Sequence, residues 1–128
     1  LNLQHIYIEN MECINQSNNL LFENKKGYSY QCELTNTIVV NFDGIITSYK
    51  IRDFLIFQRM VNSVNVLDML YNLSDEGDFK LIEATKRNFS KELTICEIVQ
   101  LRDLLNGTKF TIVLNSMLLE VLSDTVVY

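Results

Sequence analysis

The chain has 128 residues, 48% of them hydrophobic and 21% charged, a composition that is typical of a soluble globular domain and excludes an intrinsically disordered chain. Its net charge of −5 opposes attraction to polyanions. The basic pairs Lys25–Lys26 and Lys86–Arg87 are too short to reverse it, so no nucleic-acid partner is expected. With no proline and 4 glycines the sequence offers no flexible linker, and residues 1–128 are expected to form a single domain.

The N-terminal third is predicted to be an antiparallel meander of three or four strands, because apolar and polar residues alternate along it. The turn signals are Asn18–Asn19, the segment Asn24–Gly27 and the pair Asp43–Gly44. Gly27 can adopt positive φ at no steric cost, which hairpin turns favour. Strands are expected at residues 5–8, 20–22, 28–32 and 37–42.

A first helix is expected to follow the meander. Thr47 or Ser48 is predicted to cap it, since a hydroxyl group there can accept a hydrogen bond from the first turn. The apolar stripe of this helix consists of residues at helical spacing: Ile51, Phe54, Leu55, Gln58 and Val61. Residues 64–73 either extend the helix past a break at Asn62–Ser63 or form a separate short helix.

The second half is predicted to open with two strands. After a polar loop at residues 74–78, strands are expected at residues 79–84 and 88–93. Thr94 and Glu97 have the spacing of a capping box, in which each side chain satisfies a backbone N–H group of the other residue. A second amphipathic helix is therefore expected to start here.

This second helix is expected to end at Asn106–Gly107, because glycine commonly terminates helices. The following segment, residues 110–122, is apolar almost all round. That pattern predicts a further helix after a tight turn, with a strand at the start of the segment as the alternative.

Together these elements predict an α+β fold, with an antiparallel sheet built from the N-terminal meander and a second strand pair and covered on one face by two to four helices. Each half of the chain places strands before a helix. Residues 20–64 and 79–122 could therefore be a strand–strand–helix pseudo-repeat.

Several of these segments resemble a family of small uncharacterised bacterial proteins, a domain of unknown function. The similar segments are the strand motif Gly27-Tyr28-x-x-x-Cys32, the strand at residues 38–42, the helix with Phe54 and Phe57, and residues 89–105. The resemblance implies an α+β fold and a bacterial source, and it implies no activity because the family has none assigned. Thr35 stands where that family often has a second cysteine, so the likeness carries no metal or redox site over to this chain.

Reactive residue types are sparse, and no catalytic, cofactor or metal site is predicted. His5 is the sole histidine and stands in an expected edge strand, without the partners that a triad or a metal site needs. Cys32 is expected to be a core thiol. Cys96 is also expected to face the core, although its place in the first turn of a helix could make it reactive. The carboxylates of residues 75–78 lack the spacing of a calcium loop.

Cysteine content and hydropathy suggest where the protein resides. Three cysteines, an odd number without a disulfide framework, favour a reducing compartment and therefore the cytoplasm. No stretch approaches the roughly 18 consecutive apolar residues of a membrane span, so no membrane association is expected.

The apolar residues of the expected helices exceed what one sheet face can cover. A helix that is apolar all round must be buried or packed against another chain, which predicts a homodimer or another protein partner. The candidate interaction residues are Phe57, Met60, Met117, Leu118 and Val121. The leading hypothesis is a non-enzymatic interaction or regulatory module. The competing hypothesis is a small-molecule-binding domain or enzyme, with a pocket between sheet and helices that could use Tyr28, Tyr30, Arg52 or Cys96.

Overall fold

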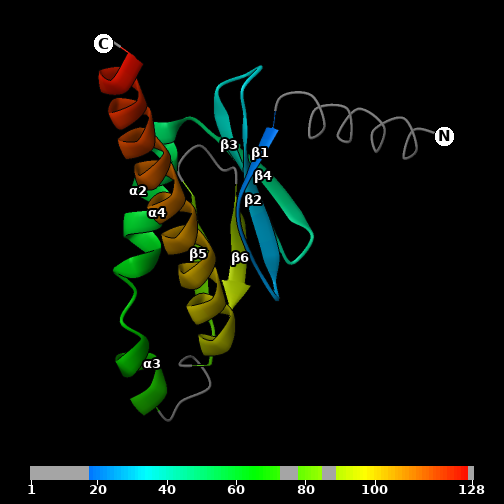
Figure 1. Ribbon diagram of the computed structural model, residues 1–128. Helices are drawn as coiled ribbons and strands as arrows, with labels where there is room; N and C mark the ends of the chain where they lie inside the picture. Colours follow the sequence, from blue (N-terminus) through cyan, green and yellow to red (C-terminus); the bar gives the residue numbers. More distant parts are fainter. Residues whose placement is uncertain (1–17, 73–77, 85–88, 127–128) are drawn as a thin grey trace, which may run out of the picture.

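The computed structural model describes residues 18–72, 78–84 and 89–126. These residues form a four-stranded antiparallel sheet, a two-stranded antiparallel sheet and three helices (Figure 1). The strands are β1 (Asn18–Asn24), β2 (Gly27–Cys32), β3 (Thr37–Phe42), β4 (Ile45–Tyr49), β5 (Lys80–Glu83) and β6 (Ser90–Leu93), and the helices are α2 (Ile51–Asn62), α3 (Val66–Tyr71) and α4 (Ile95–Val126). The predicted α+β class, with its meander, second strand pair and covering helices, is confirmed.

The larger sheet is a meander in which each strand pairs with the next, in the order β1-β2-β3-β4. The predicted turns at Asn24–Gly27 and Asp43–Gly44 are both present. Asp43 and Gly44 have positive φ, 53° and 84°, as a two-residue hairpin turn requires. Gly27 has a different role from the predicted one: it does not adopt positive φ, but a Cβ on it would lie 1.8 Å from the carbonyl oxygen of Asn41.

The N-terminal boundary of the sheet differs from the prediction. Asn18 and Asn19 form no turn, because they are the first residues of β1 and pair with Cys32 and Gln31 of β2. Continued pairing satisfies their backbone groups better than a turn does. The strand expected at residues 5–8 and most of the loop expected at 74–78 lie outside the described residues.

The first helix begins later than predicted. Thr47 and Ser48 belong to β4, and buried Thr47 donates a hydrogen bond of 2.8 Å from its hydroxyl group to the hydroxyl group of Tyr49. Helix α2 starts at Ile51 with Lys50 as its N-cap residue and without a side-chain cap. The side chain of Thr47 therefore stabilises a strand and is not a helix cap.

The core lies between helices α2 and α4 and the two sheets, with Ile82 of β5 and Leu93 of β6 among its buried residues. In β3 the alternate residues Ile38, Val40 and Phe42 are at most 2% exposed and belong to this core. Tyr49 of β4 stacks on Phe57 of α2, with ring centroids 5.2 Å apart. Aromatic side chains thus close the seam between the sheet and the helices.

Helix α3 is a separate short helix, one of the two predicted alternatives. Ser63 is the C-cap residue of α2. The side chain of Asn65 then accepts a hydrogen bond of 3.0 Å from the backbone N–H group of Asp68 and starts α3. The break at Asn62–Ser63 is therefore stabilised at both sides.

The second strand pair and the capping box are confirmed. Strands β5 and β6 pair antiparallel within the two segments predicted for them. The side chain of Glu97 accepts a hydrogen bond of 3.0 Å from the backbone of Thr94, and the hydroxyl group of Thr94 accepts one of 3.2 Å from the backbone of Glu97. Helix α4 begins at Ile95, directly after Thr94, and Glu97 lies in its first turn.

The predicted helix end at Asn106–Gly107 is wrong, because α4 runs unbroken from Ile95 to Val126. The strand alternative for residues 110–122 is wrong for the same reason. Gly107 lies where β1 meets the helix, and a Cβ on it would come within 2.4 to 2.5 Å of the ring of Phe22. Here glycine provides room for a strand and does not terminate the helix.

Candidate interaction surface

Hydroxyl groups join strands β1 and β2 to the middle of α4. The hydroxyl group of Thr111 donates a hydrogen bond of 2.9 Å to the carbonyl oxygen of Leu21, the residue at which the register of β1 shifts. The hydroxyl oxygens of Ser29 and Thr108, both fully buried, lie 2.5 Å apart. These bonds hold the helix against the sheet up to Thr111.

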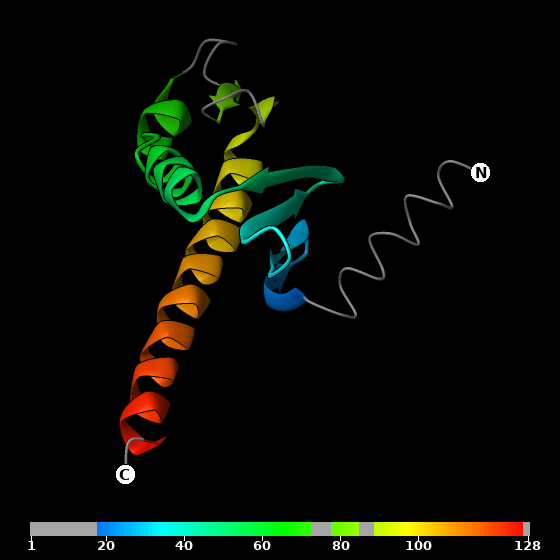
Figure 2. The same ribbon diagram turned by 90° about the horizontal axis from the view of Figure 1, so that it is seen from above.

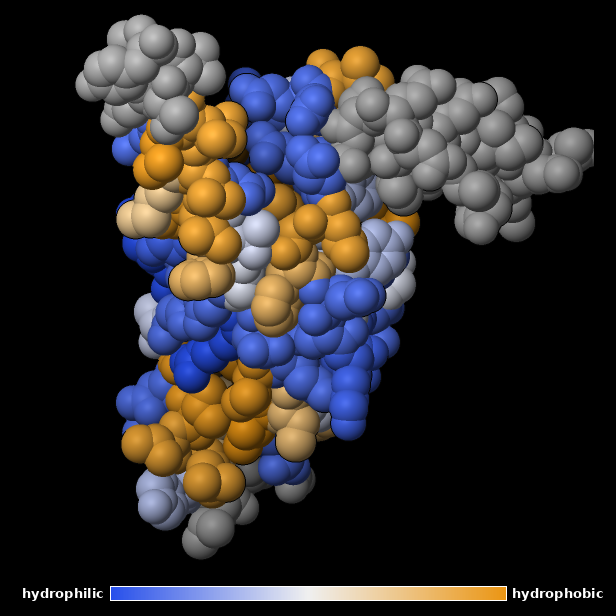
Figure 3. All heavy atoms as spheres, viewed as in Figure 1, coloured by the Kyte–Doolittle hydropathy of each residue, from blue (hydrophilic) through white to orange (hydrophobic). Residues whose placement is uncertain are grey.

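Beyond this point α4 continues past the sheet, as Figure 2 shows. From Val113 to Leu122 every residue is exposed, although most of them are apolar. The large apolar side chains exposed after Thr108 are Phe110, Val113, Leu114, Met117, Leu118, Leu119, Val121 and Leu122. Their exposed fractions run from 42% for Leu114 to 67% for Phe110, and they gather into an apolar region over the end of α4 in Figure 3. Contiguous apolar patches on a protein surface commonly mark sites that bind a partner.

Five of these side chains share one side of the helix, which is here called the outer face. They are Phe110, Val113, Leu114, Met117 and Val121, at the i, i+3, i+4, i+7 and i+11 spacing of one helical stripe. Leu101 is fully buried and precedes Phe110 by nine residues, which is about two and a half helical turns. The two side chains therefore lie on opposite sides of α4. The outer face therefore points away from the core.

The opposite side of the same segment borders a groove of about 620 Å³. Strands β1 and β2 form one wall and α4 forms the other. The lining residues are Asn19, Leu20, Gln31, Glu33, Thr111, Asn115, Leu118, Leu119 and Leu122. The end of α4 thus has apolar side chains on two sides, one along the groove and one facing outward.

Charge is scarce on this part of the helix. Glu120 is the only charged residue from Phe110 to Leu122, and Lys109 comes directly before Phe110. Lys109 and Glu120 are 11 residues apart, which is about three helical turns, so they lie on the same flank of the outer face.

The five predicted interaction residues separate into three groups. Phe57 is 1% exposed and packs between Tyr49 and Phe89, so it belongs to the core and not to a surface. Met60 is half-buried and packs against the core. Met117, Leu118 and Val121 are 51% to 61% exposed on α4, with Leu118 on the groove side.

The sequence prediction missed Phe110, which is the most exposed apolar residue of the outer face. The helix end expected at Gly107 separated it from the residues before it. A usable signal was present: the helical spacing of Ile98, Leu101 and Leu105 continues through Thr108 without a change of phase.

Arg102 of α4 has a structural role at the end of α2. Its guanidinium group donates 3.2 Å hydrogen bonds to the carbonyl oxygens of Val61 and Asn62, and a further one to that of Val64. These carbonyl groups belong to the last turn of α2 and the link that follows it. Arg102 therefore caps α2 from the neighbouring helix.

Polar side chains form a small network where α2 lies against α4. The Gln58 amide nitrogen donates a hydrogen bond of 2.9 Å to Asn106, and Asn62 donates one of 2.8 Å to the same oxygen. The Oε1 atom of Gln58 is buried and accepts no hydrogen bond from the described residues. Beside this network a cavity of about 330 Å³ is lined by Gln58, Asn106, Lys109, Phe110 and Val113, at the start of the outer face.

The residues named for the competing pocket hypothesis do not converge. Tyr28, Tyr30, Arg52 and Cys96 line none of four surface pockets formed by the described residues. Tyr28 and Tyr30 stack on each other with ring centroids 6.3 Å apart on β2. Cys96 is exposed rather than directed into the core as expected, whereas Cys32 is buried as predicted.

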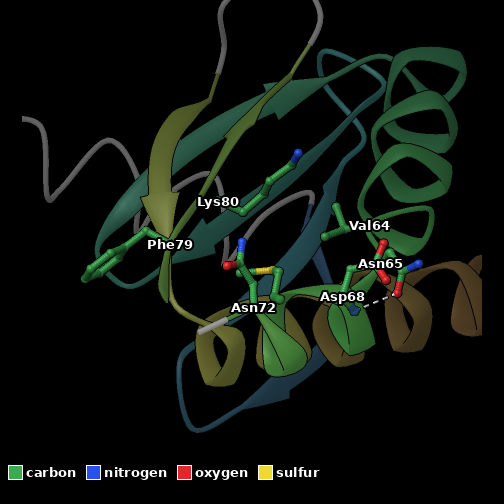
Figure 4. Close-up of a pocket in the computed structure, with 7 residues that line it drawn as sticks. Val64, Asn65, Asp68, Asn72, Phe79 and Lys80 are labelled. Atoms are coloured by element: carbon green, nitrogen blue, oxygen red, sulfur yellow. Dashed lines mark hydrogen bonds between the residues drawn. The ribbon is translucent and has the colours of Figure 1, made fainter. Parts of the chain in front are cut away.

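A smaller pocket of about 230 Å³ lies between α3 and β5 (Figure 4). Its lining includes Asn65 and Asp68, which are joined by the hydrogen bond that starts α3. Phe79 points away from the other lining side chains in this view. The polar groups here stabilise a helix end and show no convergence on a common centre.

Asp43 and Tyr49 are among the titrating groups whose pKa is shifted by their surroundings. Lys91 of β6 donates a 2.9 Å hydrogen bond to Asp43 in the β3–β4 turn, and together with the charge of Lys26 this bond lowers the pKa of the Asp43 carboxyl group. Burial raises the pKa of Tyr49 to about 12. The ion pair of Asp43 with Lys91 links the two sheets. The raised pKa of Tyr49 means that its buried hydroxyl group stays uncharged.

Across residues 18–72, 78–84 and 89–126, no three His, Cys, Asp or Glu side chains come together as a metal site would need. In the same ranges, no helix combines the length and apolar character required to cross a bilayer. No protein-family model matches the chain, and neither a curated protein nor a solved structure was found to be similar to it. The resemblance to the bacterial family therefore stays a prediction.

Proposed function

We propose that this protein is a non-enzymatic protein-interaction module of the cytoplasm whose binding surface is the end of α4. One observation carries the proposal: from Phe110 to Leu122 the helix exposes eight large apolar side chains and a single charge. Leaving such a surface in water is unfavourable, because each apolar side chain gains free energy when a partner covers it. A protein partner supplies the matching apolar surface.

The closed core supports an interaction role over catalysis. Tyr49, Phe54 and Phe57 fill the seam between sheet and helices at 2% exposure or less, so they leave no room for a substrate where they lie in the described part of the chain. The polar residues that could have served an active site lie apart from one another. Function is therefore assigned to the surface.

A capture experiment on extracts of the protein's own source tests the proposal. The bait is the full chain, compared with the double variant Phe110→Glu/Met117→Lys. A matched control, Leu67→Lys/Leu70→Glu, changes two similarly exposed apolar residues of α3, which are 63% and 58% exposed. We expect a protein that is retained by the wild type and the control and lost with the double variant. Identical retention by all three baits would refute the proposal.

A second candidate function rests on the groove beside α4. Its lining combines polar groups such as Gln31 and Glu33 with apolar ones such as Leu118, the mixture that small-molecule sites use. A small amphipathic ligand would protect the amides of β1 and of residues 111–122 from hydrogen exchange. The outer-face variants would leave that protection unchanged, which separates the two functions.

A further inference from the structure

The geometry points to a second copy of this chain as the partner of the outer face, with the two α4 helices packed antiparallel about a two-fold axis. This inference rests on the proposed function and names the partner of the same surface. Self-association requires the face to be complementary to itself, which can be judged from the residues of one chain.

The apolar spacing of the outer face suits a helical partner. Phe110, Leu114, Met117 and Val121 alternate steps of four, three and four residues, the pattern with which two helices interlock side chains along a shared seam. Phe110 and Val121 mark the ends of this stripe, roughly 16 Å apart along the axis at 1.5 Å per residue. An antiparallel partner places its Val121 against Phe110 and its Met117 against Leu114, so large side chains meet along the whole seam.

Charge selects the antiparallel direction. Lys109 and Glu120 lie on the same flank, one near each end of the stripe. A two-fold axis between antiparallel helices brings equal flanks together, so Lys109 faces Glu120 of the partner subunit, a contact that occurs twice per dimer. In a parallel pair each residue would lie level with the same residue of the partner subunit, and neither Lys109 nor Glu120 would face an opposite charge.

The surroundings of the outer face leave room for this arrangement. The sheet lies on the opposite side of α4, where Thr111 and Leu119 line the groove, so it does not obstruct an approach to Met117. At its first turn the outer face meets the cavity of about 330 Å³ beside Gln58 and Phe110. In the antiparallel register the end of the partner's helix lies over this cavity and contacts α2 as well.

The size of the face predicts a reversible dimer. Five half-exposed apolar side chains at roughly 100 Å² each give about 500 Å² per partner, below the ~800 Å² of a standard stable interface. The dimer is therefore expected to dissociate on dilution, with a dissociation constant on the order of micromolar.

The inference is tested by light scattering behind a sizing column, which measures the mass of the full chain. The concentration range, about 1 to 500 µM, spans the expected micromolar dissociation constant. We expect the mass to rise from monomer to dimer, and Met117→Lys to abolish the dimer. Leu119→Lys, an equal change on the groove side, is expected to leave it intact. Lys109→Glu and Glu120→Lys should each weaken the dimer by about tenfold, because each creates two like-charge contacts. The double swap Lys109→Glu/Glu120→Lys should restore it, and circular dichroism confirms that each variant keeps its helices.

Disulfide formation between chains reports the direction of the helices. In a background with Cys13→Ser, Cys32→Ala and Cys96→Ser, chains carrying Phe110→Cys are mixed with chains carrying Val121→Cys under mild oxidation. Antiparallel packing yields the mixed dimer, whereas parallel packing yields only the two like-with-like dimers and would overturn the inference.

Two further outcomes would also overturn it: a monomer at every concentration, or a dimer indifferent to Met117→Lys and both charge reversals. If the wild type stays monomeric while its captured partner is still lost with the Phe110→Glu/Met117→Lys bait, the second-copy inference fails and the proposed function stands. If neither mass nor capture depends on the outer face, both fail.

Discussion

Replacing Gly107 with alanine tests the claim that this glycine makes room for a strand. An alanine Cβ would lie 2.4 to 2.5 Å from three ring carbons of Phe22, whereas carbon atoms pack at about 3.5 to 4.0 Å, so the ring would have to retreat by about 1 Å. Overpacking of this kind typically costs about 1 to 3 kcal/mol. In an exposed helix interior the same change would stabilise by about 1 kcal/mol, because alanine has the higher helix propensity.

The two effects oppose each other, and the larger one decides the sign. We expect Gly107→Ala to lower the free energy of unfolding by about 1 kcal/mol in the wild type, where strain exceeds the gain in propensity. In a Phe22→Ala background the ring is absent, and the same substitution should raise the free energy of unfolding by about 1 kcal/mol. The coupling between the two sites is therefore about 2 kcal/mol.

Urea denaturation followed by circular dichroism measures all four corners of this double-mutant cycle. Ser116→Ala, on an exposed part of the same helix, is the control for propensity alone and should stabilise both backgrounds equally. Equal stabilisation by Gly107→Ala in both backgrounds would refute the reasoning, since Phe22 would then not be what requires glycine at this position.

Three further predictions follow from contacts between elements. Arg102→Met should lower the free energy of unfolding by about 2 kcal/mol, because three carbonyl oxygens lose charged donors. Arg52 is exposed, so the control Arg52→Met should change the free energy of unfolding little. Urea denaturation measures both variants. Thr94→Ala should cost about 1 kcal/mol by the same assay, since one half of the capping box is lost. Folding lowers the pKa of Asp43, so this ion pair contributes its full stability above the ordinary aspartate pKa of about 4 and loses it as the pH falls below that value. Lys91→Met should flatten that part of the stability profile against pH, and an unchanged profile would contradict the assignment.

Local patterns predicted the fold where local and tertiary forces agree. Alternation along β2 and β3, the turn signal at Asp43–Gly44 and the Thr94–Glu97 box all appear in the structure as predicted, because each depends mainly on residues close in sequence. The prediction was wrong at Gly107, where packing against a strand some 85 residues away outweighs the usual preference of glycine for helix ends. It was also wrong at Thr47, since a hydroxyl group suited to a helix cap is equally satisfied by Tyr49 within a strand.

The interaction surface could be predicted only in part for a related reason. An apolar helix indicates burial or a partner, and sequence cannot distinguish the two without knowing where the sheet ends. Phe57 and Met117 both lie in strongly apolar segments, yet one is fully covered by Tyr49 and Phe89 and the other is 58% exposed. The difference arises because the helices lie on the sheet over only part of α4.

The hydroxyl bonds between the larger sheet and α4 also bear on the order in which the chain folds. Leu21 and Thr111 are 90 residues apart, and Ser29 and Thr108 are 79 apart. Strands β1 to β4 pair only with their neighbours and can assemble early, whereas the seam with α4 must close one of the longest loops the chain can form. Docking of α4 onto β1 is therefore expected to be the slow, late step of folding. A nascent chain in which α4 is not yet synthesised would hold a formed sheet whose edge strand β1 lacks its helix partner.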